Sequence, residues 1–303
     1  MYQNHFRLKE YPFSITPDTG FFYASQGSQA ALNTLLVAIR MGEGFIKVVG
    51  EVGTGKTLLC RHLLHSLGDE FQTAYILNPL LTPQELMLQL ADELGVDARS
   101  MGGGGSTQFG ARLPKALNVR LLQLAYQGRR VLVCLDEAQA MPIKTLELLR
   151  LLSNLETEKF KLVQVVIFGQ PELDEKLKHP SIRQLRQRIT FEHRLSALSK
   201  HELKHYVHHR LTVAGHQGLP LFTAPALWLL HLGTRGYPRM VNVVAHKALI
   251  CAYGRGGERV QLRDVKDAVL DTDAAGCEVG LMGLMALMIF GLSLLALGLA
   301  RIR

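Results

Sequence analysis

The sequence predicts an α/β fold in which a parallel sheet is flanked by helices, followed by a small all-helical domain and a C-terminal transmembrane helix. Three observations support this prediction. Strand patterns alternate with helical patterns over residues 46–195, as expected for a parallel sheet covered on both faces. Only helical periods follow over residues 196–272. Residues 279–300 form one apolar run without a charged side chain.

The first helix of the α/β part follows an irregular N-terminal segment, and both fall within residues 1–45. Leu32, Leu35 and Ile39 recur at helical spacing, and Gly42 is the expected stop. A flexible surface loop is expected at the four consecutive glycines 102–105. We expect strands at residues 45–50, 73–77, 131–135, 162–168 and 189–195. We expect the further helices of this part at residues 58–67, 83–94, 113–127 and 143–155.

The net charge and the cysteine content limit the kinds of binding partner and the cellular compartment that we expect. The formal net charge of +8 favours anionic partners such as nucleotide phosphates, anionic lipid or nucleic acid, and it selects none of them. The four cysteines are scattered without a CxxC pair, which excludes the disulfide framework of a small secreted domain and indicates a reducing compartment. The N-terminus has no basic stretch before an apolar one, so we expect no cleavable signal peptide and a mainly cytoplasmic chain.

A glycine-rich motif directly follows the first predicted strand. Residues 50–57, GEVGTGKT, fit G-x-x-x-x-G-K-[ST] without a mismatch and precede a predicted helix. Gly53 and Gly55 let backbone N–H groups close around the β-phosphate of ATP, where a Cβ would block the required dihedral angles. Lys56 is expected to reach the β- and γ-phosphates, and Thr57 to offer its hydroxyl to Mg²⁺. The alternative is a glycine turn before a helix. The predicted nucleotide-binding residues of this loop are Gly50, Glu51, Val52, Gly53, Thr54, Gly55, Lys56 and Thr57.

Two acidic residues, Asp136 and Glu137, end the predicted strand at residues 131–135. We expect Asp136 to hold Mg²⁺ through water and Glu137 to polarise the attacking water. This acidic pair indicates hydrolysis rather than phosphoryl transfer to a small acceptor, and the alternative is a solvated turn. Gln170 follows the strand at residues 162–168, where it would touch the γ-phosphate or the water, or would serve only its turn.

Arginines supply the remaining candidate residues. Arg183, Arg186 and Arg188 lie on the last helix of the α/β part. The cluster is explained either by a solvated helix face or by Arg188, or failing that Arg186, acting on the γ-phosphate of a neighbouring subunit. Arg239 opens a helix of the small domain, from which we expect it to reach the phosphates; a solvated position is the alternative.

One match to a metal-site pattern is declined. His201, Glu202 and His205 fit H-E-x-x-H, the zinc-protease pattern. Ser199 and Glu202 also form a capping box, which accounts for Glu202 at the start of a helix. The apolar residues of that helix occupy its other face, so we expect solvated histidines and no catalytic zinc.

Several stretches together carry a family resemblance, namely GEVGTGKT, VCLDEAQ, FGQPEL, LRQRI, GYPRMVN and the leader LKEYPFSITPD. Over about residues 5–270 the sequence resembles the AAA+ ATPases of the ExeA/GspA type, which serve general secretion, and within them those of MSHA pilus biogenesis. The resemblance implies a P-loop AAA+ sheet with a helical lid domain, and an ATPase that uses ATP and Mg²⁺. It also implies a homo-oligomeric ring and partners among the pilus or secretion assembly proteins of the bacterial inner membrane. Secretion members continue past their apolar run into a periplasmic part thought to engage peptidoglycan, a function that we do not carry over.

Residues 279–300 are predicted to cross that membrane. As one helix these 22 residues span about 33 Å, close to the hydrocarbon core of roughly 30 Å. Cytoplasmic ATP requires the ATPase domain inside, which places Arg301 and Arg303 outside, against the positive-inside tendency. We give the requirement for ATP more weight than this short tail. The alternative is a core helix of the soluble domain.

Three functions follow from these observations. The leading one is a membrane-anchored ATPase that supports assembly of a type IV (MSHA-like) pilus or of type II secretion machinery. A DNA-associated AAA+ ATPase similar to transposition regulators would use the basic charge on the phosphate backbone. The predicted membrane helix disfavours that alternative, and we expect no nucleic-acid partner. A nucleotide-gated scaffold would bind ATP with little turnover.

Overall fold

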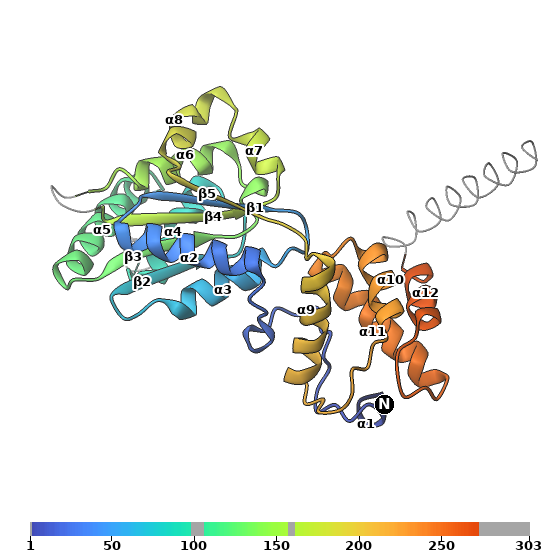
Figure 1. Ribbon diagram of the computed structural model, residues 1–303. Coiled ribbons are helices and arrows are strands. Elements are labelled where there is room, and N and C mark those ends of the chain that lie inside the picture. Colours follow the sequence, from blue (N-terminus) through green and yellow to red (C-terminus); the bar gives the residue numbers. More distant parts are fainter. Residues whose placement is uncertain (1, 98–105, 157–160, 273–303) are drawn as a thin grey trace, which may run out of the picture. The chain divides into compact units, whose positions relative to one another are not determined.

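The chain folds into two units, each with its own buried apolar cluster. The α/β unit comprises residues 24–196, and the helical unit comprises residues 2–23 and 197–272. Figure 1 shows the helices and strands of each unit. The computed structural model describes residues 2–97, 106–156 and 161–272.

Five strands of the α/β unit form one parallel sheet in the order β2-β3-β4-β1-β5. Strands β1, β3 and β4 are buried at nearly every position, because helices cover both faces of the sheet. Since all strands run the same way, the ends of β1, β3 and β4 meet at one edge. The strands are β1 (Phe45–Gly50), β2 (Phe71–Ile76), β3 (Arg130–Leu135), β4 (Val163–Gly169) and β5 (Phe191–Leu195).

Helices α2 and α3 cover one face of this sheet, and α6 lies on the other (Figure 1). Alternate strand residues, among them Val133 and Val165, pack with Leu86 of α4, Leu117 of α5 and Leu146 of α6 in one apolar cluster. The helices are α2 (Gln26–Met41), α3 (Lys56–Ser66), α4 (Pro83–Glu93), α5 (Ser106–Tyr126), α6 (Ile143–Leu152), α7 (Glu172–Lys176) and α8 (Arg183–Arg188).

The predicted parallel sheet flanked by helices is confirmed. The predicted helix boundaries differ most from the observed ones at α5 and α6. Helix α5 begins at Ser106 rather than at residue 113, with Pro114 in its interior. Proline favours the first turn of a helix, so the sequence pattern places the start next to it. Helix α6 ends at Leu152 instead of residue 155, because Ser153 is its C-cap and donates its side-chain hydroxyl to the Arg150 carbonyl.

The helical unit combines the C-terminal helices with the N-terminal segment. The sequence-based division assigned residues 1–45 to the ATPase module, whereas the contacts group residues 2–23 with the helical unit. Phe6 and Phe13 are buried in its apolar cluster. Its helices are α1 (Tyr2–His5), α9 (Lys200–Val213), α10 (Ala224–Thr234), α11 (Pro238–Gly254) and α12 (Leu262–Leu270), with a short 3₁₀ turn at Thr19–Phe21.

Arg210 of α9 fastens the N-terminal segment to this unit. Its guanidinium is buried, donates hydrogen bonds to the carbonyls of Pro12 at 2.5 Å and Ser14 at 3.3 Å, and lies 4.7 Å from the ring centre of Phe21. All of these partners belong to residues 12–21. Because this irregular segment lacks the backbone hydrogen bonds of a helix or strand, the arginine supplies donors to its carbonyls instead. Arg210 is therefore a structural residue of the helical unit.

Within the described ranges, no helix is long and apolar enough to cross a membrane. The predicted transmembrane helix at residues 279–300 lies outside the described residues, and so does the glycine run at residues 102–105. Both remain predictions from the sequence.

Candidate functional site

The loop between β1 and α3 has the backbone of an anion cradle. Gly53 and Gly55 have φ of 79° and 96°, a region that side chains disfavour. Thr54 is buried and its hydroxyl donates to the Glu51 carbonyl at 2.8 Å, which closes the loop on itself. Gly55 is the N-cap of α3 and supplies no side-chain cap, so the first N–H groups of the helix are available to an anion.

Lys56 places a buried ammonium group inside this loop. Only 4% of the residue is exposed, and its Nζ donates to the carbonyls of Gly50 at 2.8 Å and Glu51 at 3.0 Å. Burial lowers the pKa of Lys56 below its ordinary value, although the nearby carboxylates of Glu137 and Asp136 oppose this shift. The Lys56 ammonium group can give up its hydrogen bonds to these two carbonyls and donate to phosphate oxygens in their place.

Asp136 joins the loop to the end of β3. The Thr57 hydroxyl donates to one Asp136 carboxylate oxygen at 2.6 Å, and the Glu137 backbone N–H donates to the other at 2.9 Å. Asp136 is buried, so its position is fixed by these bonds. Two residues 79 positions apart in the sequence thus meet at the edge where β1 and β3 end.

Glu137 is held by two glutamine side chains. Gln139 Nε2 and Gln170 Nε2 donate to the same Glu137 oxygen, Oε2, at 2.5 Å and 2.9 Å. Gln139 Oε1 also accepts the Gln170 backbone N–H at 3.0 Å, so the three side chains form one network. Glu137 has φ of 53°, a left-handed conformation that is strained for a residue with a side chain and is often found at functional sites.

This network changes the acidity of Glu137. Burial raises the pKa of the Glu137 carboxyl. Hydrogen bonds from Gln170 and Gln139 and the charge of Lys56 together lower the pKa by more than burial raises it, so the net pKa lies below the ordinary value. Glu137 therefore carries its charge at neutral pH, as a proton acceptor must. Sequence reasoning did not single out Gln139, although it stands in the quoted stretch VCLDEAQ.

Gln139→Leu and Gln170→Leu are each expected to shift the acid limb of the ATPase pH profile to higher pH. If Glu137 takes the proton of the attacking water, as its sequence position predicts, it does so only as the carboxylate, so turnover would be lost as the pH falls through its pKa. Removing either amide removes a cause that lowers this pKa, so the loss begins at a higher pH. Steady-state rates against pH measure the shift, with the exposed Gln123→Leu of α5 as control. An acid limb that stays in place would contradict the assigned role of the amides.

The oxygens of Thr57 and Asp136 fit a magnesium ion. A hydroxyl and a carboxylate 2.6 Å apart are hard oxygen donors, the ligands that Mg²⁺ prefers alongside water and phosphate oxygens. Among the described residues, no group of three or more His, Cys, Asp or Glu side chains could hold a metal by itself. Where Mg²⁺ binds with a nucleotide, phosphate oxygens and water usually complete a small number of protein ligands.

The predicted arginines lie on α8 and at the start of α11. Arg183 and Arg186 of α8 are exposed, and the half-buried Arg188 donates to the Ser153 hydroxyl at 3.2 Å. No hydrogen bond or ion pair in the described chain joins these three side chains to residues 50–57. Arg239 is exposed at the start of α11 in the helical unit, so its expected approach to the phosphates stays a prediction.

The H-E-x-x-H match has a structural explanation. Ser199 and Glu202 form both halves of a capping box at the start of α9. His201 and His205 are exposed, with their Nε2 atoms 3.2 Å apart. No third metal-binding side chain joins them in the part of the chain that the structure describes.

The comparison with known sequences gives one domain family and one relative. Residues 39–177 match the AAA domain family. The chain is 40% identical over 290 residues to general secretion pathway protein A of Aeromonas hydrophila, a match that covers 94% of this chain and 52% of that protein. The chain thus spans about half the length of this curated relative.

Solved structures share the fold at low sequence identity. The ORC2 protein of Aeropyrum pernix, solved as ADPNP–ADP complexes, has a TM-score of 0.62 at 17% identity, covering 86% of this chain and 72% of that chain. Drosophila ORC bound to DNA has a TM-score of 0.63 at 16% identity, covering 88% of this chain and 65% of that chain. The RuvB Holliday junction branch migration motor of Thermotoga maritima has a TM-score of 0.56 at 16% identity, covering 88% of this chain and 76% of that chain. These likenesses show a P-loop, AAA-like fold.

Proposed function

We propose that this chain, in which residues 39–177 match the AAA domain family, is an ATPase that hydrolyses ATP at the P-loop edge of its parallel sheet. The observation that carries the proposal is the meeting of Lys56, Thr57, Asp136 and Glu137 at that edge. Each group has a distinct chemical capacity, and together they suffice for phosphate binding and water activation.

The side chains divide the work as follows. Lys56 and the N–H groups of the loop would bind the β- and γ-phosphates. The Thr57 hydroxyl and, through water, the Asp136 carboxylate would hold Mg²⁺. Bound Mg²⁺ would neutralise charge on the β- and γ-phosphate oxygens. Glu137 would orient the attacking water and accept its proton. Gln170 donates to the Glu137 carboxylate, and from there its side chain would touch the γ-phosphate or the water.

Lys56→Ala is expected to weaken ATP binding by about 10²-fold, because charge-assisted hydrogen bonds to phosphate are lost. Titration with a fluorescent ATP analogue measures the Kd. Lys144→Ala, which removes an exposed lysine of α6, is the matched control and should bind normally. Circular dichroism distinguishes lost binding from lost folding, since Lys56 is buried. Unchanged ATP affinity in a folded Lys56→Ala protein would contradict the proposal.

The proposed biological role is the assembly of type II secretion machinery or of an MSHA-like type IV pilus at the bacterial inner membrane. Its support is the 40% identity to general secretion pathway protein A. Assembly as a homo-oligomer would give Arg188 a neighbouring nucleotide on which to act. Residues 279–300 would anchor the ATPase domain on the cytoplasmic side of the membrane.

Removal of residues 277–303 is expected to move the protein from the membrane to the soluble fraction with its ATPase rate kept. The removed stretch contains the whole apolar run and lies beyond α12, the last helix of the described chain. Fractionation of cell lysates and ATPase assays on both fractions measure the two effects. A truncated protein that stays with the membrane would show that the anchor lies elsewhere.

A further inference from the structure

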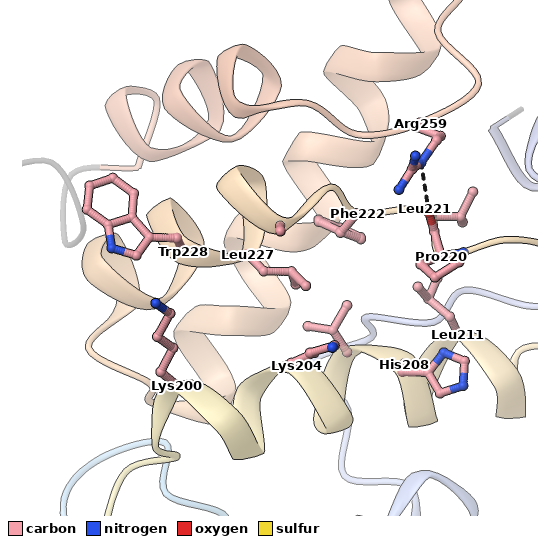
Figure 2. Close-up of a pocket in the computed structure, with 12 residues that line it drawn as sticks. Lys200, Lys204, His208, Leu211, Pro220, Leu221, Phe222, Leu227, Trp228 and Arg259 are labelled. Carbon is pink, nitrogen blue, oxygen red and sulfur yellow. Dashed lines mark hydrogen bonds between the residues drawn. The ribbon is translucent and has the colours of Figure 1, made fainter.

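A groove in the helical unit contains none of the residues that we assign to ATP. It is bounded by one side of α9, by residues 220–222, by the first turns of α10 and by Arg259, and its volume is about 360 Å³ (Figure 2). This volume lies within the usual range of ligand-binding pockets, roughly 300–1,000 Å³. The groove is therefore large enough to take one or two large side chains of a partner.

The floor of the groove is apolar. Val207 and Leu211 of α9 face Leu221, Phe222 and Leu227 across it. The first four of these side chains are at most 4% exposed and belong to the buried cluster of the unit. The apolar surface that a partner can reach therefore comes mainly from the half-buried Leu227 and the exposed Trp228, which line the groove beside them. A partner covers the apolar floor of a groove by inserting a side chain, whereas a partner with a flat surface does not reach the floor.

The rim of the groove is basic. Lys200, Lys204 and His208 follow one another at intervals of four residues, so they line one face of α9 (Figure 2). Arg259 stands at the far end, where its Nε donates to the Pro220 carbonyl at 3.0 Å. No acidic residue lines the groove, and within the described residues neither Lys200 nor Lys204 has a carboxylate partner.

We propose that this groove binds an acidic peptide segment of a partner protein, with an apolar side chain of that segment seated on the floor. Carboxylates of the segment would pair with Lys200, Lys204 and Arg259, which supply charge that the helical unit leaves unmatched. Nucleic acid would match the rim and leave the apolar floor uncovered. A bilayer surface would match the rim without reaching the floor. This inference does not rest on the proposed ATPase activity.

Trp228 supplies a direct probe of the groove. It lines the groove, is 47% exposed and is the only tryptophan of the chain. The full chain in detergent micelles is titrated with a short peptide in which glutamates flank a leucine–phenylalanine pair. A saturable change in tryptophan fluorescence is expected. Peptides with lysines in place of the glutamates, or with serines in place of the apolar pair, should bind at least about tenfold more weakly.

Two changes in the protein separate the rim from the floor. Lys200→Glu with Lys204→Glu should weaken binding of the acidic peptide by about tenfold, since two attractions become repulsions. Arg263→Glu with Lys266→Glu, two exposed residues of α12 outside the groove, changes the net charge equally and should leave binding unchanged. Ala224→Phe places a ring over the groove from an exposed position, so it should block the peptide without altering the core.

Three results would overturn the proposal. The first is the absence of a saturable change with the acidic, apolar peptide. The second is equal binding of the serine-substituted peptide, which would make the site electrostatic only. The third is tighter, Lys200- and Lys204-dependent binding of a duplex DNA oligonucleotide or of short-chain phosphatidylglycerol, which would assign the groove to nucleic acid or to lipid instead.

Discussion

Glu137→Gln is expected to reduce ATP turnover by on the order of 10²–10⁴-fold while ATP binding stays intact. The change keeps the size of the side chain and removes its capacity to accept a proton. Lys56 and Thr57, which would contact the phosphates and Mg²⁺, are untouched. Steady-state release of phosphate measures the loss of turnover, and titration with a fluorescent ATP analogue measures the retained affinity.

The control for this experiment is the same chemical change on the surface. Glu175→Gln replaces an exposed carboxylate of α7 that pairs with Lys178, so both rate and affinity should stay near those of the unaltered protein. Comparison with Lys56→Ala then separates the two roles. Equal loss of ATP affinity in Glu137→Gln and Lys56→Ala would contradict the division between phosphate binding and water activation.

Arg188→Ala is expected to reduce turnover by about 10³-fold while the protein still binds ATP. Arg188 ends α8, and within the described residues its guanidinium has no carboxylate partner, only the Ser153 hydroxyl at 3.2 Å. The proposed action on the nucleotide of a neighbouring subunit requires such a guanidinium that no carboxylate neutralises. Ser153→Ala is the matched control, because it removes the hydrogen bond and keeps the charge, and it should retain turnover.

Mixing two inactive proteins shows whether Arg188 acts between subunits. Lys56→Ala lacks a working phosphate loop, and Arg188→Ala lacks the arginine. In a mixed assembly some interfaces pair an intact loop with an intact arginine, so ATPase activity should reappear. If the two proteins demonstrably assemble together and activity does not reappear, Arg188 acts within its own subunit or has no role in turnover.

The sheet was predictable mainly from β1, β3 and β4, which are short, largely apolar runs with clear ends. The strand at residues 45–50 was placed at its observed bounds, and the one at residues 131–135 begins one residue earlier in β3. The N-terminal segment was not predictable, because its place in the helical unit depends on contacts such as that of Arg210 with Pro12, 198 residues away. Helical and strand periods carry no information about such contacts.

The candidate site was predictable where motifs stand at strand ends. A glycine loop after β1 and an acidic pair after β3 lie at the same edge of a parallel sheet. With β4 between the two strands, the structure brings Thr57 and Asp136 together there. The place of Gln139 was not predictable. It depends on the left-handed backbone of Glu137, a conformation that no local pattern of non-glycine residues signals.

The most direct test of the account is the identity of the nucleotide that stays bound to Glu137→Gln. The protein is incubated with ATP and Mg²⁺, free nucleotide is removed, and the bound fraction is released and separated by chromatography. The account predicts ATP on Glu137→Gln and ADP on the unaltered protein, because binding is kept and water activation is lost. ADP on both proteins would show that Glu137 does not activate the water, and would contradict the proposed mechanism.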